Sequence, residues 1–258
     1  MFDAVYGLKS LDEKPLVDEI VRAPSYGEGI IHLSDNVRID VRNKKKLANW
    51  GIFGKSGMGK TTALMIIANQ HKNAIIFDSK GGAIELIDEY GVKGWEFYRI
   101  GEGMRRAKQL KINVFDLAPT TVNILYSGAS ALERRRIRKL TPFLSIGTPK
   151  PRKRKKKEMT SELAEKKNYD NFMELLETER LEFLGDELSL ILHSKDKGTP
   201  LEEFCRGKKI IDVSTYDYRN RSIGVLVDSL FYRIRMIPEL QSERLLIGTD
   251  DIQRIGES

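Results

Sequence analysis

The amino-acid sequence predicts an α/β protein with a mostly parallel sheet covered by helices on both faces. Three observations favour this class. Apolar runs of strand length alternate with segments of helical period, and a glycine-rich turn separates the first strand of the core from its first helix. Of the 258 residues, 40% are hydrophobic and 31% are charged, which is enough to build and to solvate a large core. Strands that alternate with helices indicate a parallel sheet, because each crossover helix lies on a face of that sheet.

Residues 1–46 are expected to form an N-terminal segment that contains one β-hairpin. Two apolar runs, Ile30–Leu33 and Val37–Val41, flank the turn sequence Ser34-Asp35-Asn36. In the second run apolar residues alternate with Arg38 and Asp40, which predicts that one face of the hairpin is buried.

Residues 47–258 are expected to form the core, with a helical and basic insertion at about residues 101–205. Before the insertion, the pattern predicts strands at 50–53, 74–77 and 95–100, and helices at about 60–70 and 83–90. The insertion is expected to hold helices at 130–140, 161–176 and 179–193. After it come a strand at 209–213, a helix at about 222–236 and a strand at 244–248. In the first helix, Leu64, Ile67 and Ala68 are expected to share the buried face.

Composition excludes several classes of protein. No apolar run approaches the roughly 20 residues of a membrane-spanning helix, and the N-terminus lacks the pattern of a secretory signal. The single cysteine, Cys205, excludes an internal disulfide framework. We therefore expect a soluble cytoplasmic protein. Cys205 and the three histidines have no partners at metal-ligand or catalytic spacing, so they are interpreted as structural: His32, His71 and His193.

A glycine-rich motif between the first core strand and helix carries the clearest chemistry. It matches the phosphate-binding pattern G-x-x-x-x-G-K-[ST] and reads Gly54-Lys55-Ser56-Gly57-Met58-Gly59-Lys60-Thr61. Glycines allow backbone N–H groups to converge on phosphate oxygens, and the helix that follows presents its positive N-terminal end. The pattern predicts binding of ATP and Mg²⁺, with Lys60 on the β- and γ-phosphates and Thr61 as a metal ligand. The expected nucleotide-binding residues are Gly54, Ser56, Gly57, Met58, Gly59, Lys60, Thr61 and Thr62.

Such a motif needs a carboxylate at the end of a neighbouring strand. The run Leu245–Ile247 is followed by Gly248, Thr249, Asp250 and Asp251. We expect Asp250 to orient the Mg²⁺ shell and Asp251 to polarise the attacking water, so that Lys60, Asp250 and Asp251 form the catalytic set. Asp78 and Asp212 also end predicted strands; either could be the metal acid instead, or a helix N-cap.

With these motifs the sequence resembles the FtsK–HerA superfamily of DNA-pumping ATPases, and most of all its HerA-like branch. The resemblance covers roughly residues 37–254. It rests on the glycine-rich motif and on three later motifs in family order: Asp78-Ser79-Lys80-Gly81, Ile211-Asp212-Val213-Ser214 and Asp250-Asp251-Ile252-Gln253. It implies a RecA-like core that works as a ring, with a hexamer as the expected state. ATP hydrolysis at subunit interfaces would then move duplex DNA. Asp251 departs from the family, which has glutamate there.

Basic residues are concentrated in two clusters. The net charge is +7, and the two clusters together hold more positive charge than that. The first, Arg134–Lys139, falls in a predicted helix; one of its arginines could act across a subunit boundary, and the sequence does not select which. The second is a candidate DNA-binding loop or a solvated surface loop, and its basic residues are Lys150, Arg152, Lys153, Arg154, Lys155, Lys156 and Lys157.

Two other functions stay open at the level of sequence. The first is a P-loop kinase that acts on a nucleoside or another small molecule, with the helical region as its lid. The second is a nucleotide-dependent scaffold that does not hydrolyse ATP, which Asp251 and the end of the chain at Ser258 favour. Within the translocase class, viral packaging, conjugation and repair are not separated, so the expected partner is a capsid protein, a conjugation protein or a nuclease.

Overall fold

A computed structural model describes residues 30–34, 37–40, 52, 57, 59–101, 106–147, 165–214, 221–236 and 245–249. Its centre is a five-stranded sheet in the order β5-β4-β6-β3-β7, and every pairing in it is parallel. The strands are β3 (Asn73–Asp78), β4 (Trp95–Arg99), β5 (Lys108–Gln109), β6 (Lys208–Asp212) and β7 (Leu245–Thr249). The predicted α/β class with a parallel sheet is confirmed.

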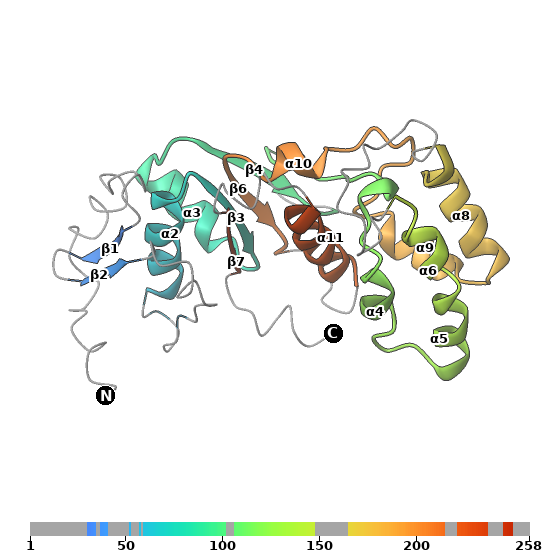
Figure 1. Ribbon diagram of the computed structural model, residues 1–258. Helices are drawn as coiled ribbons and strands as arrows, with labels where there is room; N and C mark the ends of the chain where they lie inside the picture. Colours follow the sequence, from blue (N-terminus) through green and yellow to red (C-terminus); the bar gives the residue numbers. More distant parts are fainter. Residues whose placement is uncertain are drawn as a thin grey trace.

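The predicted hairpin is present next to the first helix of the core (Figure 1). Strands β1 (Ile30–Ser34) and β2 (Val37–Asp40) pair antiparallel, with Ile31 opposite Ile39. Of the strand expected at residues 50–53, only Ile52 lies in the described part of the chain, where it is exposed.

One face of the sheet is covered by α2 (Lys60–Gln70) and α3 (Gly82–Tyr90). Ile76 of β3 and Ile210 of β6 pack there with Met65 and Ala68 of α2. More residues of α2 are buried than we expected: Met65, Ile66 and Gln70 are also buried. Leu64, in contrast, is only partly buried. The reason is that α2 contacts the sheet, α3 and β1 at once, and a helix with several neighbours buries more than one stripe.

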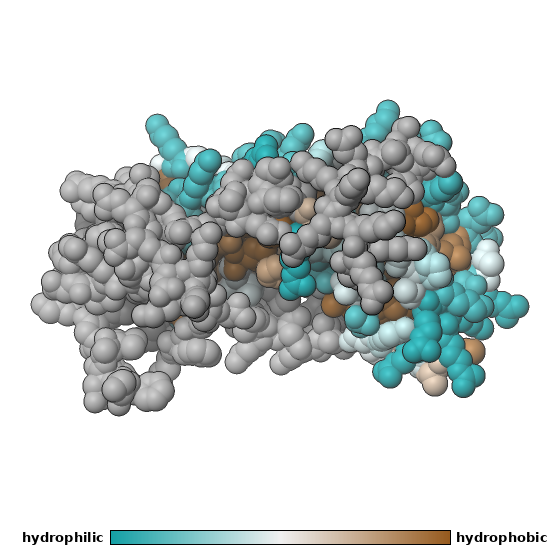
Figure 2. Space-filling view, in the orientation of Figure 1, coloured by the Kyte–Doolittle hydropathy of each residue, from teal (hydrophilic) through white to brown (hydrophobic). Residues whose placement is uncertain are grey.

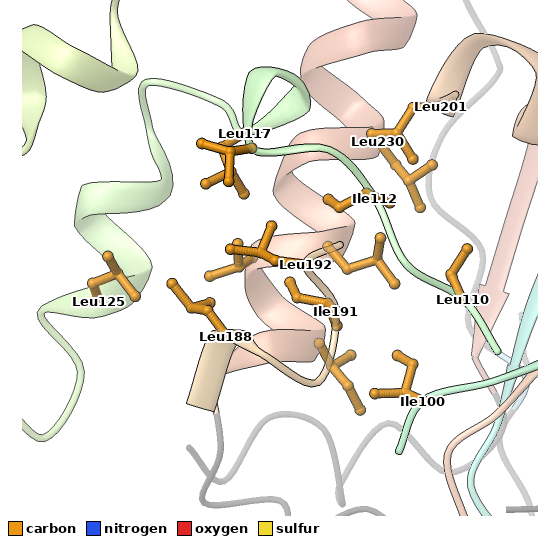
Figure 3. Packing of buried hydrophobic residues seen from close by; sticks show 14 of the residues in the cluster. Ile100, Leu110, Ile112, Leu117, Leu125, Leu188, Ile191, Leu192, Leu201 and Leu230 are labelled. Atoms are coloured by element: carbon orange, nitrogen blue, oxygen red, sulfur yellow. The ribbon is translucent and has the colours of Figure 1, made fainter. Parts of the chain in front are cut away.

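The opposite face of the sheet packs against α11 (Ser222–Met236) and a helical region. Ile75 and Phe77 of β3 belong to this second cluster, so alternate residues of β3 serve the two faces. Figure 3 shows apolar side chains from residues 100–117, 188–192 and α10 gathered against α11. The described helices of this region are α4 (Thr121–Leu125), α5 (Ala131–Arg138), α6 (Thr141–Leu144), α8 (Tyr169–Thr178), α9 (Glu182–Leu188) and α10 (Leu201–Phe204).

The helical region follows the sequence prediction at some points and departs from it at others. Helix α5 begins at Ala131, close to the predicted start at 130, and a capping box forms there: the Glu133 amide donates to the Ser130 hydroxyl and the Ser130 amide donates to Glu133. The helix expected over 179–193 is wrong in extent, since α9 covers only Glu182–Leu188. The chain then turns so that the Ile112 amide donates to the Ile191 carbonyl and the His193 amide donates to the Ile112 carbonyl. This pairing with a distant segment replaces the last helical turns.

Candidate nucleotide site at the start of α2

The carboxyl edge of the sheet brings together residues from four adjacent strands. Asp78 of β3 lies opposite Asp212 of β6, and Asp212 lies opposite Arg99 of β4. On the other side of β3, Thr249 of β7 lies opposite Phe77. Ligands of α/β proteins bind outside the carboxyl ends of parallel strands, so this edge is where a site is expected.

Helix α2 begins at the same edge. It ends at Gln70, close to Asn73 where β3 starts, so α2 runs antiparallel to β3 and its first residues lie near the end of that strand. Two glycines at the start of α2, Gly57 (φ 79°) and Gly59 (φ 74°), have left-handed backbone conformations. Residues with side chains are strained in this region, which gives a physical reason for glycine at both positions.

The first turn of α2 has an unusual charge for a helix N-terminus. It contains no acidic residue, and its first residue is Lys60, followed by Thr61 and Thr62. All three are partly exposed. A helix N-terminus carries the equivalent of about half a positive charge, so a lysine at this position repels it. The repulsion is offset when an anion binds both the lysine and the helix amides.

A close contact joins α2 to β7. A Cβ atom at Gly248 would lie 2.8 Å from Cδ1 of Ile76 and 2.9 Å from Cδ1 of Leu64. Glycine in a strand often marks the place where another element approaches closely. Gly248 therefore lets α2 lie directly against β7, whose last residue, Thr249, immediately precedes Asp250 and Asp251 in the sequence.

Asp78 has a structural task at this edge. Its carboxylate is fully buried. One oxygen accepts hydrogen bonds from the amides of Lys80 (3.3 Å) and Gly81 (2.9 Å), and the other accepts from those of Ala83 (2.9 Å) and Ile84 (3.0 Å). These bonds cap the N-terminus of α3. Of the two roles that the sequence left open for Asp78, metal acid or helix cap, the geometry supports the cap.

Asp212 is held by a local turn. Its Oδ1 accepts from the Ser214 amide (2.9 Å) and from the Ser214 hydroxyl (2.6 Å), and the residue is 5% exposed. Next to it stands Arg99, which sequence reasoning did not single out. The Arg99 Nε is buried without a hydrogen-bond partner among the described residues. A basic residue at the end of a predicted core strand was the signal that could have drawn attention to it.

Among the residues predicted to form the site, the described ones lie together at the start of α2: Gly57, Gly59, Lys60, Thr61 and Thr62. The others lie outside the described residues: Gly54, Ser56, Met58, Asp250, Asp251, Lys150, Arg152, Lys153, Arg154, Lys155, Lys156 and Lys157. Within the part of the chain that the structure describes, no group of three or more His, Cys, Asp or Glu residues is arranged to hold a metal ion.

Two residues interpreted as structural have environments that agree with that role. Cys205 is 1% exposed, and burial raises the pKa of its thiol to about 12. Such a thiol stays protonated and is a poor nucleophile. His193 accepts hydrogen bonds at Nδ1 from the amides of Lys195 and Lys197, which closes a turn.

Comparison of the chain with protein-family models, curated proteins and solved structures gave no match. Within the described ranges, no helix has both the length and the apolar character that crossing a membrane requires.

Proposed function

We propose that this chain binds MgATP at the start of α2 and hydrolyses it. The observation that carries the proposal is the combination of a G-x-x-x-x-G-K-T sequence with a helix that begins directly after the left-handed Gly59. In this arrangement the amides of the glycine-rich segment and of the first helical turn bind phosphate oxygens. Lys60 supplies a positive charge to the β- and γ-phosphates, and Thr61 supplies an oxygen ligand for Mg²⁺.

The acids that complete this chemistry are proposed to be Asp250 and Asp251. Mg²⁺, when bound, neutralises charge that develops on the phosphates. Asp250 would hold the water shell of the metal, and Asp251 would accept a proton from the attacking water. The contact of α2 with β7 through Gly248 supports this role, because it brings the strand that leads to both acids against the helix that begins with Lys60.

For the complete protein we propose a RecA-like ATPase core that works as a ring, with a hexamer as the expected state, and moves duplex DNA. This part rests on the resemblance to the HerA-like branch. The motifs Asp78–Gly81 and Ile211–Ser214 lie at the carboxyl ends of the neighbouring strands β3 and β6. That arrangement supports a common site for the motifs.

The test measures ATP turnover by the full chain alone, with duplex DNA, and with small-molecule phosphate acceptors. Stimulation by duplex DNA is the expected result. Stimulation by an acceptor indicates a kinase, and no turnover under any condition, with binding retained, indicates a scaffold. Lys60→Ala should abolish turnover, whereas the control Lys72→Ala, just beyond the other end of α2, should leave it unchanged.

The two acids are expected to have separate effects. Asp251→Asn should preserve MgATP binding and stop turnover, whereas Asp250→Asn should weaken the dependence on Mg²⁺. Single-turnover measurements over a Mg²⁺ series distinguish these effects. If Asp251→Asn hydrolyses ATP at the wild-type rate, Asp251 does not activate water.

A further inference from the structure

One exposed face of α5 consists almost entirely of cations. Arg134, Arg135, Arg138 and Lys139 are all exposed, and their spacing of three or four residues places them on the same side of the helix. Ile137 and Leu140 are buried and hold the opposite side. We call the four cations the arginine face. Figure 2 shows hydrophilic atoms gathered at the end of the molecule where Figure 1 places α5.

The arginine face is not explained by contacts within the chain. Lys139 pairs with Glu179 at 2.7 Å. In the part of the chain that the structure describes, no ion pair or hydrogen bond engages the side chains of Arg134, Arg135 or Arg138. Like charges separated by four residues on a helix repel and destabilise it, which applies to Arg134 with Arg138 and to Arg135 with Lys139. Cations near a helix C-terminus gain from the dipole, but this gain falls off within the last turn.

The surrounding charges make this face distinct within the helical region. Between Tyr169 and Leu188, the stretch that contains α8 and α9, the sequence has seven acids and a single arginine. Compared with α8 and α9, α5 therefore carries an excess of positive charge. It also lies at the end of the molecule away from α2 (Figure 1), so it does not belong to the candidate nucleotide site of the same chain.

We propose that the arginine face binds the phosphate backbone of a nucleic acid. Guanidinium groups bind phosphate oxygens in pairs of hydrogen bonds, and α5 offers three guanidinium groups that have no partner among the described residues. Protein interfaces, in contrast, are built around an apolar and aromatic centre, and the only large apolar side chain exposed on α5 is Leu132, at 57%. The proposal rests on the proposed function for its choice of duplex DNA, and it extends that function by naming the surface.

The experiment measures binding of the full chain to a fluorescent duplex DNA over a salt series. The test variant carries Arg134→Gln, Arg135→Gln and Arg138→Gln. The matched control removes the same charge from scattered exposed lysines, with Lys72→Gln, Lys93→Gln and Lys195→Gln. Each phosphate contact contributes about 0.9 to the slope of log affinity against log salt. The test variant should flatten this slope by about 2 to 3 and bind about 100-fold to 500-fold more weakly at 0.1 M salt, while the control changes far less.

The outcomes distinguish DNA binding by the arginine face from a general effect of net charge and from binding of an acidic protein. Equal losses in the two variants would mean that only net charge matters, and would overturn the proposal. So would binding of poly-L-glutamate as tight as that of DNA with the same dependence on α5, which would indicate an acidic protein partner. Thermal unfolding of both variants checks the fold. Because α5 is remote from α2 of the same chain, binding of MgATP without DNA should not change in the test variant, and DNA binding should survive Lys60→Ala. Loss of one activity thus does not imply loss of the other.

Discussion

Helices α2 and α3 begin in the same way at the same edge of the sheet, yet the charged side chains at their N-termini differ. Each starts after a glycine in the left-handed conformation, Gly59 for α2 and Gly81 for α3. At α3 the chain supplies its own anion, because the buried Asp78 accepts hydrogen bonds from four amides around the start of that helix. At α2 the first turn contains a lysine and no acid.

We interpret this difference as one between a structural helix start at α3 and the proposed ligand-binding start at α2. A carboxylate that accepts several amide hydrogen bonds stabilises the fold and leaves little room for an external anion. A lysine at the same position repels the helix dipole, and a bound phosphate turns this repulsion into attraction. The comparison predicts that changes at α3 alter stability, whereas changes at α2 alter binding.

The largest expected effect on stability is that of Asp78→Ala. Removing the carboxylate leaves buried amides of α3 without their acceptor, which we expect to lower the free energy of unfolding by about 2–4 kcal/mol. Urea unfolding followed by circular dichroism measures it. Asp212→Ala is the control and should cost less, because the Asp212 carboxylate closes a local turn with Ser214, whereas Asp78 binds amides at the start of a helix. Equal losses would contradict the special role of Asp78.

A second prediction concerns Lys167, which binds at the C-terminus of a helix, whereas Lys60 lies at the N-terminus of one. The Lys167 ammonium is buried and donates to the carbonyls of Leu117 and of Leu144, the last residue of α6, both at 2.8 Å. Burial, and then repulsion by Arg233, lower the pKa of Lys167 to about 7, while attraction by Asp116 opposes them. Lys167 therefore has its hydrogen-bond acceptors within the chain.

Because the pKa of Lys167 is lower in the folded chain than in the unfolded one, the unfolded chain binds more protons between pH 7 and about 10.5. Stability should therefore rise with pH in this window, by at most about 1.4 kcal/mol per pH unit, and be lost as pH falls towards 7. Chemical unfolding at pH 7, 8 and 9 should show the rise in wild type and a flatter profile in Lys167→Met. Parallel profiles would show that Lys167 does not titrate there.

Gly248→Ala should have a smaller effect, of about 1–2 kcal/mol, because the new Cβ crowds Leu64 and Ile76. If the crowding acts on α2, the double variant with Leu64→Ala should lose less stability than the sum of the two single variants. The double variant Ile76→Val with Gly248→Ala instead relieves the crowding against β3. Its deviation from additivity is compared with that of the Leu64 pair. Strict additivity in both pairs would mean that Gly248 does not set the position of α2.

The smallest expected change in stability is that of Lys60→Ala. Without nucleotide, removing a cation from the positive end of α2 should leave stability unchanged or raise it by about 0.3–1 kcal/mol. Thermal unfolding with and without MgATP checks this, since wild type should gain stability from the ligand and the variant should not. A large loss of stability without nucleotide would show that Lys60 has a structural role.

Much of the fold could be predicted because periodicity and turn residues determine it locally. The bounds of α11 match the predicted 222–236 because its apolar residues recur at helical spacing. The short strand β5 was not predicted, since Lys108 and Gln109 have no strand pattern and are fixed only by pairing with β4. At the candidate site, the motif predicts binding roles for Lys60 and Thr61, and these roles stay predictions. The sequence alone could not decide whether Asp78 is a metal ligand or a helix cap. Asp78 binds backbone amides, and no residue type reveals which amides a carboxylate will bind.

The claim that the start of α2 binds phosphate and the start of α3 does not can be tested by amide hydrogen exchange with and without MgATP. The amides of residues 57–62 should exchange more slowly when nucleotide is present, because phosphate oxygens become their acceptors. The amides of residues 80–84 should exchange slowly in both conditions, since Asp78 already binds four of them. Unchanged exchange at 57–62 with saturating MgATP, or new protection only at 80–84, would contradict the account.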